Sequence, residues 1–354
     1  MRRRNSGFSI LELVIALAIV MLVLAAATTF FISTVRQYKI QTKIVETNVE
    51  GVLGLELLRQ DLESLGFGLP WDGVTVGQDK SAAPLNAISG SPVPVVSLNN
   101  PTSGTVNKSD YIVIRSTRVG TGSAAGKWTT LQAGGGMRSW GSTEEDLAAG
   151  DRVIVLSPTL NHQTLITPTA GVLFTPAALA SYAPADNLTV TNIVYGVDNI
   201  STSPSLRFPW NRADYHIDNT LLQRPQRCAP NTGTLVKQVV SQADGTLTAP
   251  LPLLDCVADM EVIYGRDTDG NPSTALVWDD DISDLAADAV RSQLKEVRVY
   301  ILAQEGQRDD SYRTPTDNIS VGSSVLWEDV DVSGYRNYRW KVYTIVVKPR
   351  SLAN

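Results

Sequence analysis

The chain has 354 residues, of which 43% are hydrophobic and 19% are charged, and its formal net charge at pH 7 is −6. This acidic balance, without a basic patch, argues against a nucleic-acid-binding protein. Two cysteines and two distant histidines, His162 and His216, are too few ligands for a zinc-type metal centre.

The N-terminus combines a basic start with a long apolar run. Arg2, Arg3 and Arg4 precede Gly7, and Glu12 is the only charged residue between Phe8 and Ile32. An apolar helix of this length spans a hydrocarbon core of about 30 Å, and the basic flank stays on the cytoplasmic side. A carboxylate in such a helix costs roughly 2.5–3.5 kcal/mol on insertion, so its presence indicates a function.

Two ordinary explanations for this segment are weaker. A cleaved secretory signal has a shorter apolar region with small residues at its far end. Here the small residues 25–27 lie inside the run, and Phe30 and Phe31 still follow them. A simple signal anchor leaves Glu12 unexplained.

The string GFSILELVIALAI, which contains Gly7, Phe8 and Glu12, resembles the N-terminal motif of type IV prepilins. In that family a basic leader ends in glycine, and the mature chain begins with an aromatic residue and carries glutamate at its fifth position. The resemblance implies that prepilin peptidase cuts between Gly7 and Phe8 and methylates the new amino group of Phe8. Residues 1–7 are then a leader peptide, and their loss moves the formal net charge from −6 to −9.

The resemblance also implies a role for Glu12 in assembly. In the family this carboxylate pairs with the N-terminal ammonium of a neighbouring subunit, so that each buried charge has a partner. The alternative is that Glu12 reaches the membrane interface, because it lies only five residues into the span.

After the span, apolar residues continue at three- and four-residue steps to Leu65, with charges on the other faces. The pattern predicts one helix from Phe8 to about Gly66, divided into a membrane or filament-core part over 8–32 and an amphipathic continuation over 33–69. Its length is about 90 Å, so the second half must pack on the remainder of the protein. Gly51 and Gly54 mark either a bend or a close contact.

From Trp71 onward, short strands rich in β-branched residues alternate with Gly, Pro, Ser and Asn clusters. The predicted fold class is α+β, with the long helix packed on a mainly antiparallel sheet in a globular domain over 70–354. Residues 77–109 and 118–146 are expected to be long loops or decorated hairpins, and 77–250 is a candidate for an inserted subdomain. The predicted strands are 110–117, 152–156, 188–197, 215–222, 257–264, 294–304 and 336–348.

Several later segments are similar to the PilW-type minor pilins, namely 62–71, 257–270, 298–302 and 339–350. The resemblance implies a minor pilin that joins the initiating or tip complex of a pilus. Its partners would be prepilin peptidase, other minor pilins and the major pilin. Its head would be periplasmic while the chain sits in the inner membrane, and would later reach the cell surface. The competing interpretations are a J-type pseudopilin of type II secretion and a tip adhesin built on a pilin scaffold.

The exported part contains a pair of cysteines and an acidic string, DTDGN. Cys228 and Cys256 predict a disulfide in an oxidising compartment, and two free buried thiols are the alternative. Asp267 and Asp269, in the string DTDGN, have the spacing with which calcium loops begin, but a simple Asp-Gly turn is favoured over a calcium site.

The sequence offers no set of residues typical of an enzyme. It has no phosphate-binding loop, no nucleophile elbow and no helical zinc motif, so we expect neither a catalytic activity nor a cofactor. Trp128, Trp140, Trp210 and Trp327 are expected to be core or loop anchors, and an adhesive role would require that they be exposed.

Overall fold

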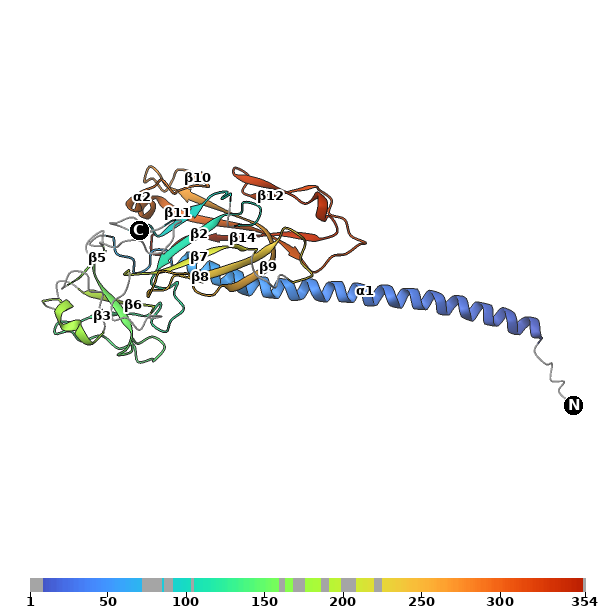
Figure 1. The fold of residues 1–354 in the computed structure, drawn as a ribbon, viewed down its shortest axis with the longest axis horizontal. Helices are drawn as coiled ribbons and strands as arrows, with labels where there is room; N and C mark the ends of the chain where they lie inside the picture. The colour runs from blue at the N-terminus through green and yellow to red at the C-terminus, as the bar shows by residue number, and fades with distance from the viewer. Residues whose placement is uncertain are drawn as a thin grey trace.

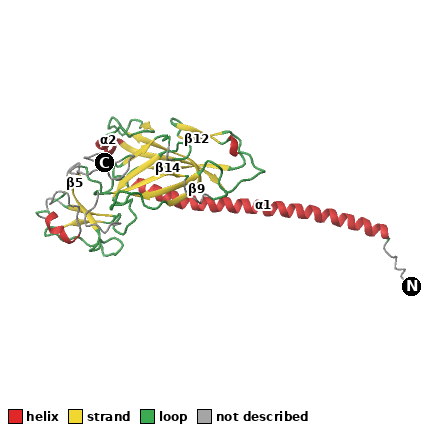
Figure 2. Ribbon diagram, viewed as in Figure 1, coloured by secondary structure: helices red, strands yellow, loops and turns green. Residues whose placement is uncertain are grey.

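A computed structural model describes residues 9–71, 85, 92–102, 105–158, 163–167, 176–185, 191–198, 208–219 and 225–352. A single long helix, α1 (Ile10–Glu63), carries a β-rich head at its C-terminal end. Its first half projects away from the head and its second half lies along it (Figures 1 and 2). The predicted α+β class, with a long helix packed on an antiparallel sheet, is confirmed.

The ends of α1 follow from local chemistry. Ser9 is the N-cap, and with Glu12 it forms a capping box. The helix ends at Glu63, three residues before the predicted boundary. Gly66 and Gly68 follow with φ angles of 73° and 65°. This left-handed conformation suits glycine and turns the chain toward the sheet.

The main sheet has eight strands, all paired antiparallel, in the order β1-β2-β7-β8-β9-β11-β14, with β10 added beside β9. All eight strands come from two separate parts of the chain, before residue 117 and after residue 210. The strands are β1 (Val95–Leu98), β2 (Tyr111–Ser116), β7 (Asn211–Asp218), β8 (Gly233–Val239), β9 (Leu251–Arg266), β10 (Val277–Asp279), β11 (Leu294–Glu305) and β14 (Arg339–Val347).

A second, four-stranded sheet lies between β2 and β7 in the chain. Its order is β3 (Trp128–Leu131), β6 (Asn192–Val197), β4 (Arg152–Pro158) and β5 (Gln163–Leu165), and the 3-10 helix η1 (Pro176–Tyr182) follows β5. Figure 1 places it beyond the C-terminal end of α1. Leu69, Tyr195 and Trp210 share one apolar cluster, which joins it to the helix exit. We propose that this sheet is the inserted subdomain considered within 77–250.

The two faces of the main sheet are covered differently. The face toward α1 forms the largest core, in which Leu55, Leu58 and Leu62 of the helix pack against the sheet. A hairpin, β12 (Asn318–Gly322) and β13 (Trp327–Asp331), packs on a second cluster that contains Ile263 and Leu302. The remaining elements are the short helices α2 (Ala287–Gln293) and η2 (Ser333–Tyr335).

Most of the predicted strands are found, with shifted ends. The predictions over 110–117, 152–156 and 294–304 agree to within two residues, and β14 begins three residues after the predicted 336. Strand β9 extends the predicted 257–264 at both ends, and the described part of 188–197 is strand from Asn192. The prediction over 215–222 was wrong at its start, because β7 begins at Asn211, and residues 220–222 lie outside the described residues.

Candidate assembly helix and its seat on the sheet

The N-terminal half of α1 is not buried by the head. Every residue from Ser9 to Lys39 is exposed, including the whole apolar run. By length and composition this helix can cross a membrane. These 31 exposed, mostly apolar residues are far more than a soluble surface tolerates, so this segment requires lipid or other protein around it.

Glu12 lies at the start of this helix and has a partner within its own chain. Its Oε2 accepts a hydrogen bond from the backbone N–H of Ser9 at 3.0 Å. The Oγ of Ser9 in turn accepts from the N–H of Leu11 at 3.3 Å. A carboxylate here also faces the positive end of the helix dipole. The predicted cleavage and methylation residues, Gly7 and Phe8, lie outside the described residues.

The second half of α1 approaches β9 closely at two glycines. A Cβ atom on Gly54 would lie 2.0 Å from the carbonyl oxygen of Leu253, and one on Gly51 would lie 3.1 Å from Cδ1 of Leu254. Both glycines are inside the continuous helix. Close packing on the sheet therefore explains Gly54, and the helix is not interrupted at either position.

Gly54→Ala is expected to destabilise the head by about 1–3 kcal/mol, because the new methyl group meets rigid backbone and forces α1 away from β9. Gly51→Ala is the matched control. Its neighbour is the end of a flexible side chain, and alanine gains about 1 kcal/mol in helix propensity. Thermal unfolding of both full-length variants in detergent would measure the difference. Equal melting temperatures for the two would contradict this packing account.

A buried charged group also fixes the helix on the sheet. Asp61 of α1 forms an ion pair of 2.6 Å with Nζ of Lys237 on β8, and the hydroxyl of Tyr215 on β7 donates to the same Oδ2. Burial raises the pKa of Asp61, while the Lys237 ammonium opposes that rise. No sequence pattern indicates this group, because Asp61, Tyr215 and Lys237 come together only in the folded chain.

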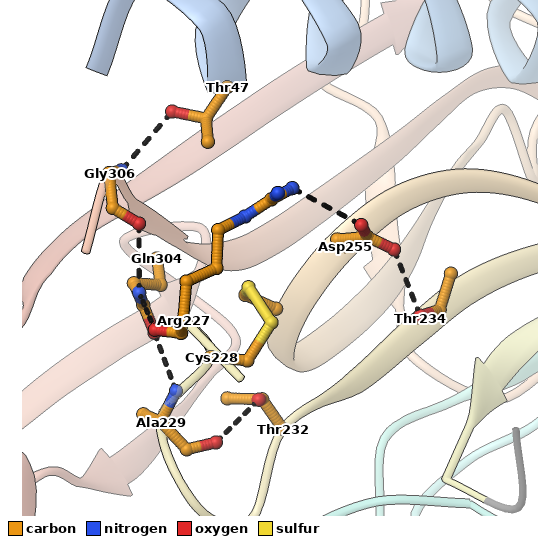
Figure 3. The surroundings of a disulfide bond; sticks show 10 residues. Thr47, Arg227, Cys228, Ala229, Thr232, Thr234, Asp255, Gln304 and Gly306 are labelled. Carbon is orange, nitrogen blue, oxygen red and sulfur yellow. Dashed lines mark hydrogen bonds and ion pairs between the residues drawn. A yellow bond between two sulfur atoms is a disulfide. The ribbon is translucent and has the colours of Figure 1, made fainter. Parts of the chain in front are cut away.

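The predicted disulfide between Cys228 and Cys256 is present, with a Cα–Cα distance of 5.0 Å, and closes a loop of 28 residues. Figure 3 shows that a set of polar contacts surrounds it. The amide of Gln304 donates to the carbonyl of Gly306 at 3.0 Å, and the N–H of Gly306 donates to Oγ1 of Thr47 on α1 at 3.1 Å. The side-chain oxygen of Gln304 also accepts from the N–H of Ala229, within the crosslinked loop, at 2.7 Å. The crosslinked loop is therefore connected to the helix.

The candidate calcium residues are engaged in a turn between β9 and β10. Oδ1 of Asp267 accepts from the N–H of Gly270 at 2.8 Å, and Oδ1 of Asp269 accepts from the N–H of Asn271 at 2.9 Å. Such bonds are typical of an Asp-Gly turn. Among the described residues, no three His, Cys, Asp or Glu side chains are arranged to hold a metal ion.

The tryptophans differ in exposure. Trp210 is fully buried, whereas Trp327 on the hairpin is 53% exposed. Trp128 and Trp140 pack on each other with ring centroids 5.1 Å apart. Of the two histidines, His216 stacks on Tyr111, and His162 lies outside the described residues.

Next to the side that packs on the main sheet, α1 presents a second apolar surface to solvent. Val45, Val49, Val52 and Leu53 are each more than 60% exposed, although the opposite side of the same turns is packed on the sheet. This stripe leads into a groove of about 600 Å³ between α1 and the start of β9. The stripe continues the exposed apolar surface of the first half of the helix.

Residues 2–28 match the family described as the prokaryotic N-terminal methylation motif. The match covers the leader and most of the apolar run, so it identifies a processing motif and says nothing of the head. No curated protein matches the chain. Among solved structures, a type IV-like pilin from Thermus thermophilus aligns with 58% of this chain and 87% of its own, at 14% identity. Its TM-score of 0.23 is too low to show a shared fold.

Proposed function

We propose that this chain is a type IV pilin-like subunit that is cut by prepilin peptidase between Gly7 and Phe8 and assembles through α1. The observation that carries the proposal is the methylation motif over residues 2–28, which includes the start of an apolar helix that is exposed throughout its first half. The motif supports cleavage by prepilin peptidase, and the exposed apolar helix supports assembly, because lipid or other subunits must cover it.

The helix would lie first in the membrane and later in the filament. In the membrane, lipid covers the apolar residues from Ile10 onward, and in an assembled filament the helices of neighbouring subunits cover the same residues. Glu12 would then exchange its bond to Ser9 for the N-terminal ammonium of a neighbour. Because an unpaired charge in such an interior is strongly destabilising, this exchange would fix the register between subunits.

We further propose that the chain is a minor pilin similar to the PilW-type pilins. The head over 70–354 is large and acidic, and its described part contains two larger sheets and the separate β12–β13 hairpin. Such a head suits a subunit present in few copies at the start or tip of a pilus. The contacts of α1 with β8 and β9 support a head rigidly joined to the helix, so that the position of the helix in the assembly fixes the position of the head.

Deletion of the gene, followed by complementation with a C-terminally tagged chain, would test this role. Fewer surface pili, with the tagged chain present in sheared filaments at a small fraction of the main subunit, is the expected result. Normal pili together with loss of secreted enzymes would instead identify a J-type pseudopilin. Normal pili and normal secretion with loss of surface attachment would favour a tip adhesin.

A further inference from the structure

Three carboxyl groups are buried together on the face of the main sheet that lies under the β12–β13 hairpin. Asp110 is fully buried, Asp259 is 2% exposed and Glu261 is 5% exposed. Asp110 accepts from the N–H of Val262 at 2.8 Å, and Asp259 accepts from the N–H of Met260 at 2.9 Å. Oε1 of Glu261 is buried and has no hydrogen-bond partner among the described residues. Such a group is costly to bury in its charged form.

The hairpin covers these groups without joining the sheet that carries them. Its two strands pair only with each other, so no main-chain ladder connects it to β9 or β11. Val321 is buried against the sheet, and Ile319, Leu326 and Val330 pack there in part. A hairpin held by side chains alone can separate from the sheet at a lower cost than a strand of the sheet.

The cover has the same sign of charge as the groups beneath it. The hairpin, residues 318–331, carries Glu328, Asp329 and Asp331 and has no lysine or arginine. Those three side chains and Asp259 line a cavity of about 320 Å³ between the hairpin and the sheet. Asp329 and Asp331 are exposed and Glu328 is half-buried. Ionisation of Asp259 and Glu261 therefore places their charges near that of Glu328, which is unfavourable.

Asn100 supplies some compensation, because its side-chain amide donates to Glu328 and its backbone N–H donates to Asp110 at 3.1 Å. The other neighbouring elements supply little. Lys108 lines the cavity, and Asp280, after β10, adds a further negative charge near Glu261. On β11, Tyr300 lies opposite Glu261, and the Arg298 side chain is bound to Glu296 at 2.7 Å. On β14, the side chains that pack in this cluster are Trp340 and Val342, which carry no charge.

We propose that the β12–β13 hairpin is a pH-sensitive flap, closed while the carboxyl groups of Asp110, Asp259 and Glu261 carry protons and released as they ionise. Release uncovers the apolar surface formed by Ile263, Tyr300 and Leu302. The inference is independent of the proposed function, because it concerns only the head.

The direction of the effect follows from proton binding. Burial, reinforced by neighbouring carboxylates, raises the pKa of Asp259 to about 7, that of Asp110 to about 8 and that of Glu261 to about 10. In the open flap these groups meet water and return toward their ordinary pKa values of about 4. Opening therefore releases protons, and closure is stable at low pH and weakens as the pH rises through these raised values. Each proton released increases the opening constant about tenfold per pH unit.

Hydrogen exchange of the full-length chain in detergent, followed by mass spectrometry from pH 6 to 9.5 and corrected for the intrinsic rate, tests the flap. The amides of residues 318–331 are expected to lose protection by at least about a hundredfold between pH 6 and 8. The amides of β7 should keep theirs, since the sheet stays folded. Protection that does not change with pH, or that is lost equally in β7, would overturn the proposal.

Glu261→Gln gives the sharper comparison. The variant has one fewer carboxyl to ionise, so its opening should rise less steeply with pH than that of the unaltered chain, by about tenfold per pH unit over part of the range from pH 6 to 9.5. Asp284→Asn, at an exposed carboxylate outside the hairpin, is the control and should behave as the unaltered chain. If Glu261→Gln does not fold, Asp259→Asn should lower the slope between pH 5.5 and 6.5 by about one proton. If the pH dependence of opening is unchanged in the variant, the flap proposal is wrong. It is also wrong if added calcium restores protection at pH 9, because the carboxyl groups would then form a cation site.

Discussion

Replacing Glu12 by glutamine is expected to prevent incorporation of the chain into filaments while leaving cleavage at Gly7 unchanged. Glutamine can still serve at the third position of the capping box, so the helix start is preserved. What is lost is the charge that would pair with the N-terminal ammonium of a neighbour. Leaving one member of a buried pair without its partner costs about 3–5 kcal/mol, which lowers the incorporated amount at least about a hundredfold.

The measurement is the ratio of chain in sheared filaments to chain in the membrane, taken from the same cells by quantitative immunoblotting. Glu12→Asp, which keeps the charge, is the matched control and should retain part of the incorporation. Normal incorporation of the glutamine variant would show that Glu12 is not an assembly residue and would favour a role at the membrane interface.

Replacing Lys237 by methionine is expected to cost the head about 3–5 kcal/mol of stability. The Asp61 carboxylate is 10% exposed and the Lys237 side chain is 5% exposed, so the variant buries a charge whose counter-ion is gone. For a head of this size the melting temperature should fall by roughly 10 °C. Circular dichroism of the full-length chain in detergent would record the shift.

The double variant Asp61→Asn, Lys237→Met separates the two possible causes of this loss. If the cost comes from the unpaired carboxylate, removing it as well should recover a large part of the stability. Lys43→Met, at an exposed pair with Glu46 on α1, should leave the melting temperature nearly unchanged. A double variant no more stable than Lys237→Met would show that the lost packing of the lysine stem dominates.

The helix could be predicted from sequence because its signals are local. The apolar run, the steps of three and four residues, and the glycines after Leu65 are all visible within a few turns, and the observed Ile10–Glu63 differs from the prediction by only a few residues. The role of Gly54 could not be decided in the same way. It depends on Leu253, a residue of β9 that lies about two hundred positions away in the chain.

The strands show the same limit. Strands with clear alternation, such as β11, were predicted, whereas β8 begins at Gly233 and contains Lys237, so it lacks the apolar signature. Its lysine is buried only because Asp61 accepts the charge. Strands β1, β3, β5, β10, β12 and β13, together with α2, were not predicted, because they are short or polar and their stability comes from tertiary packing.

The carboxyl cluster was missed for a related reason. In β9, Asp259 and Glu261 alternate with Met260 and Val262, a pattern typical of a strand with one face in water. The hairpin that covers this face is polar and did not read as a pair of strands. Two other predictions did not depend on tertiary packing. The Cys228–Cys256 disulfide, predicted from an even pair of cysteines in an exported chain, is confirmed. The turn at Asp267, predicted from the local Asp-Gly sequence, is also present.

Mass spectrometry of the N-terminal peptide of the chain, isolated from cell membranes, shows whether the chain is processed as a prepilin. We expect a chain that begins at Phe8, carries one added methyl group on its amino nitrogen, and lacks residues 1–7. In cells without prepilin peptidase the same peptide should retain the leader. An N-terminus that is uncut in the presence of the peptidase, or cut beyond the apolar run, would contradict the account.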